Sequence, residues 1–364
     1  MGIAKRIAWA VSVVPLMLLV FDTALAEPYL AISKGMQCSG CHSHPAGGGK
    51  RNVYGNAFGQ SELPSARIGD NDMWTGEIAK WLSIGGNLRA GYRYIDTPNT
   101  QETSEFELSR ATLYIEANLI PGRLSVVIDQ QVAPNASINR EAYVRLNSNN
   151  RKFFLLAGQF FLPYGLRLQD DSAFVRLATG INFTNPDRGV QIGYESGSWS
   201  TIASITNGNG GGPEVDTGKQ LSAVSTFVQS RWRTGISVNI NDAATGDREM
   251  FGLFGGLKTG PIVWLAELDR IMDDIAPGVT RDAFAGLLEA NWMPRKGHNL
   301  KISYDVLDPD DNISGDRQTR ISLIWEHTPV QFLQARVGLR RYAGIKAVNA
   351  QNRDIFFAEL HGYF

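Results

Sequence analysis

The sequence contains only two cysteines, Cys38 and Cys41, which excludes a framework of several disulfides. No excess of either charge is present, because 35 lysines and arginines stand against 36 aspartates and glutamates. Phosphate binding needs surplus positive charge, so this balance argues against a nucleic-acid partner. Long apolar runs are absent after residue 26, and their absence excludes a protein that crosses a membrane with helices.

The first residues have the pattern of a secretory signal. Lys5 and Arg6 precede an apolar stretch over residues 7–20, which is too short to be a comfortable membrane span. Ala24-Leu25-Ala26 then supplies a cleavage site with small residues. We predict that residues 1–26 are a signal peptide and that the mature chain begins at Glu27.

The two cysteines belong to the motif Cys38-Ser39-Gly40-Cys41-His42. Attachment of haem c needs two thiols that add to two vinyl groups on one edge of the macrocycle, with a histidine directly after the second thiol as an iron ligand. The motif therefore predicts one covalent haem on Cys38 and Cys41, with His42 as its axial ligand. A disulfide or redox pair is the alternative, and zinc is disfavoured because a structural zinc site needs four ligands.

The second axial ligand is left open by the sequence. Met73 is far enough along the chain to fold back over the iron, whereas His44 and Met36 lie too close to the motif to reach the opposite face easily. A histidine from elsewhere, or an iron with one open face, is the other possibility.

Three glycines follow the motif within the segment Pro45–Asn52. Glycine allows backbone conformations closed to other residues and a close approach to a macrocycle. Lys50 or Arg51 would then pair with the haem propionates. A flexible, solvated turn is the alternative interpretation of this segment.

From Trp81 to the end, short segments alternate between apolar and polar residues, as a half-buried strand does. The segments number about sixteen. They are residues 82–95, 105–119, 123–133, 139–147, 152–161, 188–195, 198–207, 218–228, 231–241, 247–258, 261–272, 280–293, 298–307, 316–327, 330–342 and 353–364.

The connections between these segments are alternately short and long, which is typical of an outer-membrane barrel. We therefore predict an all-β fold, a transmembrane antiparallel barrel of about 16 strands in the bacterial outer membrane. A soluble all-β domain is the alternative. The longest connection, residues 162–187, is expected to fold into the channel, and its Asp170 and Asp171 either attract a cation or are solvated loop charges.

The last strand ends on Phe364, an aromatic terminus on the outward-facing side. If the short turns are periplasmic, His298, His327 and His361 gather at the periplasmic mouth, and His361 points into the lumen. The N-terminal segment enters there, so we predict that it plugs or caps this end. His361 is thus a further candidate for the second haem ligand.

Two stretches, Phe106–Leu113 and Ala157–Leu166, resemble segments of the phosphate-selective porin O and P family. That resemblance implies a pore barrel over most of residues 81–364. The chain lacks the lysine-rich lumen of that family, so phosphate selectivity is not carried over.

The order of the parts also resembles that of outer-membrane cytochrome–porin fusions, through Pro28–Ala31, Gly35 and the motif from Cys38 to His42. The resemblance implies a signal peptide (1–26), a monohaem cytochrome c segment (27–80) and a porin-like barrel (81–364). Some members of that group oxidise extracellular Fe(II).

Our leading prediction is outer-membrane electron transfer through one haem c, with no catalytic side chain assigned. Its expected partners are a periplasmic electron-carrier cytochrome, outer-membrane lipid and an external donor such as Fe(II), which would make the chain a ferrous iron oxidase. The alternative is a diffusion porin whose haem segment is a gate or a sensor of small ligands.

Overall fold

The computed structural model describes residues 27–69, 73–135, 137–181, 185–243, 246–276 and 278–364, so the predicted signal peptide lies outside the described residues. The strands are β1 (Glu77–Ala79), β2 (Leu82–Asp96), β3 (Thr103–Ile120), β4 (Leu124–Ala133), β5 (Ile138–Asn147), β6 (Phe153–Phe161), β7 (Pro186–Ser196), β8 (Trp199–Thr206), β9 (Gln220–Val228), β10 (Trp232–Asn241), β11 (Arg248–Thr259), β12 (Ile262–Ala276), β13 (Val279–Trp292), β14 (His298–Asp308), β15 (Gln318–His327), β16 (Leu333–Ala343) and β17 (Asp354–Tyr363). The helices are α2 (Pro28–Lys34), α3 (Val53–Ser61) and α4 (Phe174–Thr179), with 3₁₀ turns η2 (Cys38–Gly40) and η3 (Asn349–Gln351). No helix among the described residues is long and apolar enough to cross a membrane.

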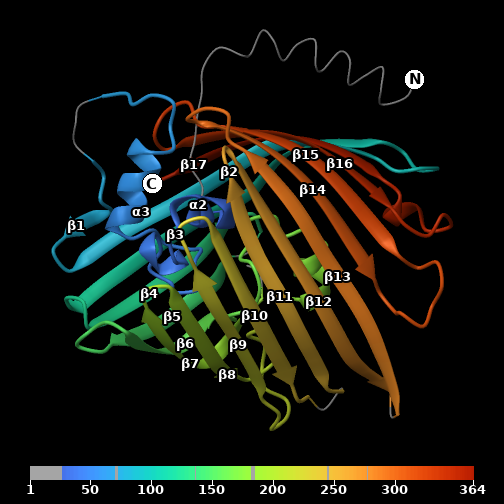
Figure 1. Ribbon diagram of the computed structural model, residues 1–364, viewed down its shortest axis with the longest axis horizontal. Helices are drawn as coiled ribbons and strands as arrows, with labels where there is room; N and C mark the ends of the chain where they lie inside the picture. The colour runs from blue at the N-terminus through green and yellow to red at the C-terminus, as the bar shows by residue number, and fades with distance from the viewer. Residues whose placement is uncertain (1–26, 70–72, 136, 182–184, 244–245, 277) are drawn as a thin grey trace.

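Strands β2 to β17 form a closed antiparallel barrel of sixteen strands (Figure 1). Each strand pairs with the next along the chain, and β17 closes the ring on β2, where Leu360 lies opposite Ala90. Closure leaves no unpaired sheet edge. The sixteen predicted strands correspond one to one with β2–β17. The short β1 forms a hairpin with β2, so the predicted boundary at residue 80 falls inside that hairpin.

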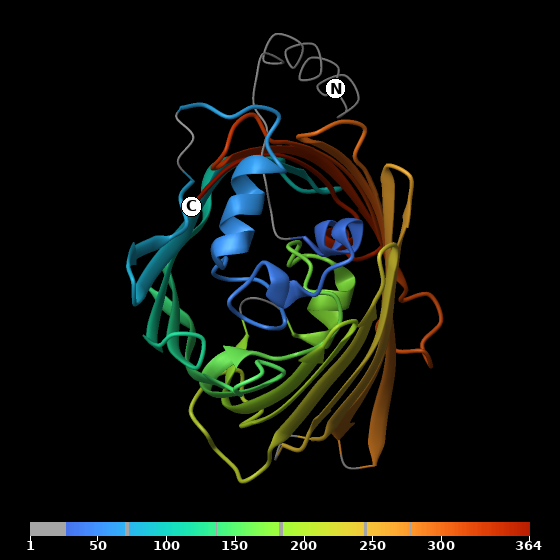
Figure 2. The same cartoon turned by 60° about the vertical axis from the view of Figure 1, so that its left-hand side comes forward.

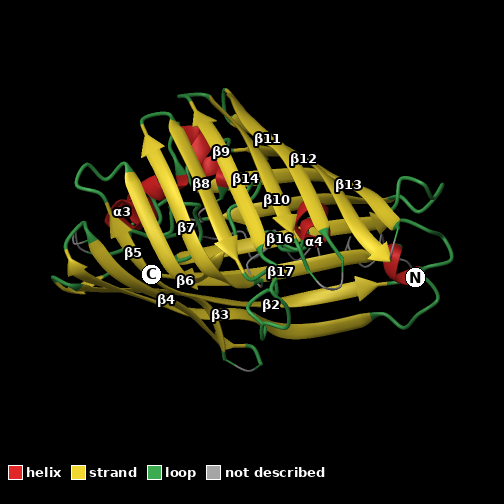
Figure 3. Ribbon diagram, turned by 90° about the horizontal axis from the view of Figure 1, so that it is seen from below, coloured by secondary structure: helices red, strands yellow, loops and turns green. Residues whose placement is uncertain are grey.

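The strands that form the wall of the barrel, drawn in yellow in Figure 3, carry apolar residues on the outer face and polar residues on the inner face, as predicted. Outward residues such as Leu253 and Leu288 are exposed, while Asp129 and Asn291 are fully buried toward the lumen. Exposed tryptophans lie near the ends of strands that meet at the short turns: Trp81, Trp199, Trp232, Trp264 and Trp292. An apolar band bordered by aromatic residues is the surface that a membrane-spanning barrel presents to lipid.

Two segments lie inside the barrel (Figure 2). One is residues 27–66, which we call the lumen segment, and the other is residues 162–181 of the long connection, which carry α4. Apolar residues of both segments pack against the inner wall, where Ile32, Phe58 and Leu166 share one core with Phe254 and Leu265. The predicted inward fold of the longest connection is thus confirmed, outside its undescribed residues 182–184.

Candidate functional site

Hydrogen bonds attach the lumen segment to strands on several sides of the barrel. Lys301 Nζ donates to Glu27 Oε1 at 3.0 Å, and Tyr29 Oη donates to Glu326 Oε2 at 3.2 Å. On another side of the barrel, Ser43 Oγ donates a hydrogen bond to Glu116 Oε2 at 2.7 Å. Further hydrogen bonds lie at the short turns, where they join Gln37 to Ser198, Ser33 to Lys258 and Ser65 to Thr328. The segment therefore occupies the end with the short turns, as predicted, which in outer-membrane barrels is the periplasmic end.

The backbone around the motif forms a compact loop that turns both cysteines the same way. The amides of Cys41 and His42 both donate to the Cys38 carbonyl at 3.1 Å. The Asn52 side chain donates to the carbonyls of Ser39 and Gly40 and also caps α3. These bonds join the motif to the helix that follows it.

The glycines after the motif have the backbone conformations that the sequence predicted. Gly47, Gly48 and Gly49 have φ values of 90°, 77° and 61°. A Cβ on Gly47 would lie 2.9 Å from Cys38 Cβ, which is too close for any side chain. The loop is an ordered hairpin, because Ser43 N donates to Lys50 O and His42 pairs with Arg51. The alternative of a solvated turn is therefore wrong.

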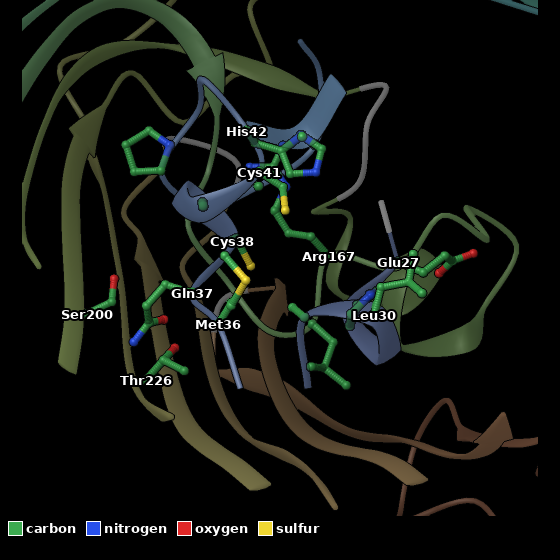
Figure 4. A pocket seen from close by; sticks show the side chains of 18 of the residues that line it. Glu27, Leu30, Met36, Gln37, Cys38, Cys41, His42, Arg167, Ser200 and Thr226 are labelled. Atoms are coloured by element: carbon green, nitrogen blue, oxygen red, sulfur yellow. The ribbon is translucent and has the colours of Figure 1, made fainter. Parts of the chain in front are cut away.

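A cavity of about 1060 Å³, including its open mouth, lies at the motif (Figure 4). Cys38, Cys41 and His42 line it together with Met36. Its apolar wall combines the lumen segment, the inward connection and the barrel: Leu30, Phe58, Leu166, Ile202 and Val224. Cofactor sites are typically apolar hollows with a few convergent polar groups.

The donor set at this cavity fits haem c. Cys38 and Cys41 both carry free thiols. His42 is buried, and its Nδ1 has no hydrogen-bond partner among the described residues. Burial lowers the pKa of His42 to about 3 and, with help from Cys38, raises the pKa of Cys41 to about 11. The imidazole therefore stays neutral, the form in which histidine binds a metal.

The candidates for the second axial ligand occupy different places. Met73 is 41% exposed and is not among the residues that line the cavity. His361 is buried and points into the lumen, as predicted, where it shares a second, smaller cavity with His42. Its Nδ1 contacts Gln334 at 3.3 Å, while its Nε2 has no hydrogen-bond partner among the described residues. Met36 lines the first cavity beside the cysteines.

The remaining histidines have other neighbours. His44 Nε2 lies 3.5 Å from Glu141 Oε1, and the His44 ring packs edge-on against Tyr143. His298 and His327 face each other at the short-turn rim with Nδ1 atoms 3.2 Å apart, beside Trp325. The predicted rim position of these two residues is thus confirmed.

Lys50 and Arg51, the two basic residues expected to pair with the haem propionates, lie in different surroundings. Lys50 Nζ forms an ion pair with Glu116 Oε2 at 3.1 Å and does not line the first cavity. Arg51 lines both cavities, with its guanidinium 4.4 Å from the centre of the Tyr363 ring. Only Arg51 is therefore placed to reach a group bound at the motif.

Two arginines at the cavity were missed by sequence reasoning. Arg233 on β10 points Nη1 at Cys38 Sγ, 3.6 Å away, and Arg167 enters from the inward connection. The alternation of β10 places Arg233 in the lumen, so its inward direction was visible in the sequence. Its position beside Cys38 was not, because 195 residues separate the two.

Asp170 and Asp171 do not have the roles considered for them. Asp170 Oδ2 accepts from Arg320 Nη1 at 2.9 Å and from Arg340 Nη2 at 3.0 Å, while Asp171 pairs with Arg110 at 2.8 Å. Both predicted roles are therefore wrong, because these carboxylates are neutralised by wall arginines and fasten the inward connection. Among the described residues, no group of three or more histidine, cysteine or acidic side chains is arranged to hold a bare metal ion.

Solved structures with a similar fold are outer-membrane porins. An anion-selective porin from Comamonas acidovorans superposes with a TM-score of 0.61 at 11% identity, over 78% of this chain and 99% of that one. A loop-deletion mutant of the outer membrane protein OmpT of Vibrio cholerae gives 0.61 at 13% identity, over the same shares of the two chains. The outer membrane channel DcaP of Acinetobacter baumannii gives 0.57 at 14% identity, over 78% of this chain and 97% of that one. No protein-family model and no curated protein matches the sequence.

The chain thus has the fold of a sixteen-stranded outer-membrane porin. Together with the apolar outer face, this fold confirms the predicted location in the bacterial outer membrane. The matched share, 78% of this chain, is about the share that strands β2–β17 and their connections make up.

Proposed function

We propose that the chain is an outer-membrane barrel whose lumen segment carries one covalent haem c for electron transfer between an external donor and a periplasmic carrier. The observation that supports it most directly is the convergence of Cys38, Cys41 and His42 on one apolar cavity inside the barrel. When bound, haem c supplies one-electron redox chemistry. Fe(II) is the donor that the resemblance to cytochrome–porin fusions implies.

The residues of the chain have separate roles in this proposal. Cys38 and Cys41 hold the group through thioether bonds, and His42 supplies a neutral imidazole to its iron. Leu30, Phe58 and Leu166 exclude water from the cavity. Because the segment lies at the end with the short turns, an acceptor would dock at the periplasmic mouth.

The second candidate function is a diffusion pore with the lumen segment as a gate. The comparisons favour this candidate on their own, because the similar structures are porins and an outer membrane channel. The lumen segment and the inward connection both lie in the path of a solute (Figure 2).

Purified protein in liposomes separates the two functions. Electron transfer predicts that Fe(II) added outside reduces the haem, and that this reduction is lost in Cys38→Ala/Cys41→Ala. A diffusion pore predicts leakage of small solutes that the same double variant leaves intact, with no turnover of the haem. Protein that releases all of its haem on denaturation would contradict the covalent attachment.

A further inference from the structure

A second cavity, of about 540 Å³ including its open mouth, lies beside the first, and the described residues that line it include four arginines and no acidic residue. Arg89 and Arg110 come from β2 and β3, Arg140 from β5, and Arg51 from the lumen segment. We call it the arginine cavity. Arg51 and His42 line both cavities, so the arginine cavity adjoins the haem-attachment motif.

Carboxylates neutralise only part of this charge. Arg110 pairs with Asp171 at 2.8 Å, and Arg140 lies 3.7 Å from Asp129. For Arg51 and Arg89, the described residues offer no carboxylate oxygen within 4.0 Å. Arg51 stacks on a tyrosine ring, and Arg89 faces the side-chain amide of Gln169. Among the described residues, these two guanidinium groups therefore have no carboxylate in direct contact, although Glu359 interacts with Arg89 over a longer distance.

Such an arrangement favours an anionic ligand. A guanidinium withdrawn from water without a counter-charge is costly, and a bound anion removes that cost. Arginine presents a planar fork of donors that matches the two oxygens of a carboxylate. Two such forks that line one cavity suit a pair of carboxylates.

We propose that the arginine cavity is a carboxylate-binding site in which Arg51 and Arg89 are the principal ligands. Two sources supply this chemistry: the propionates of a haem attached at Cys38 and Cys41, or a free dicarboxylate that enters the lumen. The first source rests on the proposed function, and the second is independent of it.

The test compares the wild type with Arg51→Gln/Arg89→Gln, which keeps side-chain length and hydrogen-bonding capacity but removes both charges. The control is Arg341→Gln, whose exposed ion pair with Asp354 lies outside the cavity. Each protein is purified with its haem content measured by staining after denaturation. The haem midpoint potential is then recorded between about pH 5 and 9, and succinate binding is measured by calorimetry.

If the propionates occupy the cavity, the double variant has a lower midpoint potential than the wild type, because two cations that favour the reduced form are gone. Its potential also becomes dependent on pH near neutrality, because propionates without arginine partners have higher pKa values. If a free dicarboxylate is the ligand, the wild type binds succinate, the double variant binds it at least about tenfold more weakly, and the dependence of the potential on pH stays as in the wild type.

The proposal is overturned if Arg51→Gln/Arg89→Gln alters neither the potential nor succinate binding relative to Arg341→Gln. Failure of the proposed function gives a different result, namely protein without covalent haem. In that case succinate binding by Cys38→Ala/Cys41→Ala tests the arginine cavity alone. If adding Arg51→Gln/Arg89→Gln to this variant abolishes succinate binding, the result supports the site. If the variant binds no succinate even with both arginines present, the result contradicts the site.

Discussion

Lys301 Nζ on β14 lies 3.0 Å from Glu27 Oε1, which joins the start of the lumen segment to the barrel wall. The same ammonium lies 3.7 Å from carboxylate oxygens of Glu289 and Glu326, and all four side chains are buried. Lys301 thus lies close to three carboxylates inside the lumen, and the buried Arg336 also pairs with Glu326, its Nε 3.4 Å from Oε1. The attachment of the lumen segment depends on this cluster more than on any exposed contact.

Lys301→Met should release the start of the lumen segment. Removing one partner of a buried ion cluster costs about 3–5 kcal/mol, because the remaining charges stay buried without compensation. We expect tryptic cleavage after Lys34 to be at least about 100-fold faster than in the wild type. Lys346→Met, at an exposed loop position, is the control. Equal cleavage rates for the two variants would mean that Lys301 does not hold the segment.

The attachment should also weaken as pH rises. Burial raises the pKa of Glu27 from 4.5 to about 6, although Lys301 opposes the shift. A carboxyl whose folded pKa is raised stabilises the folded state below its unfolded pKa, and that stabilisation is lost as pH rises through about 6. Hydrogen exchange of the α2 amides, corrected for intrinsic rates, should show an opening free energy larger at about pH 5 than at about pH 7.5. Glu27→Gln should flatten the dependence, and an unchanged slope would show that another group causes it.

Gly47→Ala should impair haem attachment. Its Cβ would lie 2.9 Å from Cys38 Cβ, so the cysteine must shift. Gly210→Ala is a matched control, because Gly210 also has a positive φ, 62°, but faces open space. Positive φ costs each alanine about 1–2 kcal/mol, and only Gly47→Ala adds a clash at the motif. Haem per protein should fall several-fold in Gly47→Ala alone, whereas equal loss in both variants would remove the role assigned to this contact.

Asp170→Asn should loosen the inward connection. Asp170 accepts from Arg320 at 2.9 Å, and Arg320 is 1% exposed, so the substitution leaves a buried guanidinium with less counter-charge. We expect larger and noisier single-channel conductance in planar bilayers. Asp311→Asn, at an exposed loop position, should behave as the wild type. Identical traces for both variants would show that the connection does not narrow the channel.

The barrel was predictable because the strand period of two is a local signal, and each strand from 82–95 onward carries it independently. The motif from Cys38 to His42 is also local, so a common role for its two cysteines and its histidine could be predicted. The partners of the lumen segment could not be predicted, because Glu116, Glu141 and Lys301 become its neighbours only when the barrel closes. Asp170 was misjudged for the same reason, because its arginines lie on strands far along the chain.

The most direct test of the account is a haem stain of the purified protein after denaturation, combined with mass spectrometry of the peptide that carries Cys38 and Cys41. The account predicts one haem per chain, attached to both cysteines, with attachment reduced in each single Cys→Ala variant and abolished in the double variant. An unmodified peptide, or a disulfide between Cys38 and Cys41 in protein matured in an exporting host with haem-attachment machinery, would contradict it.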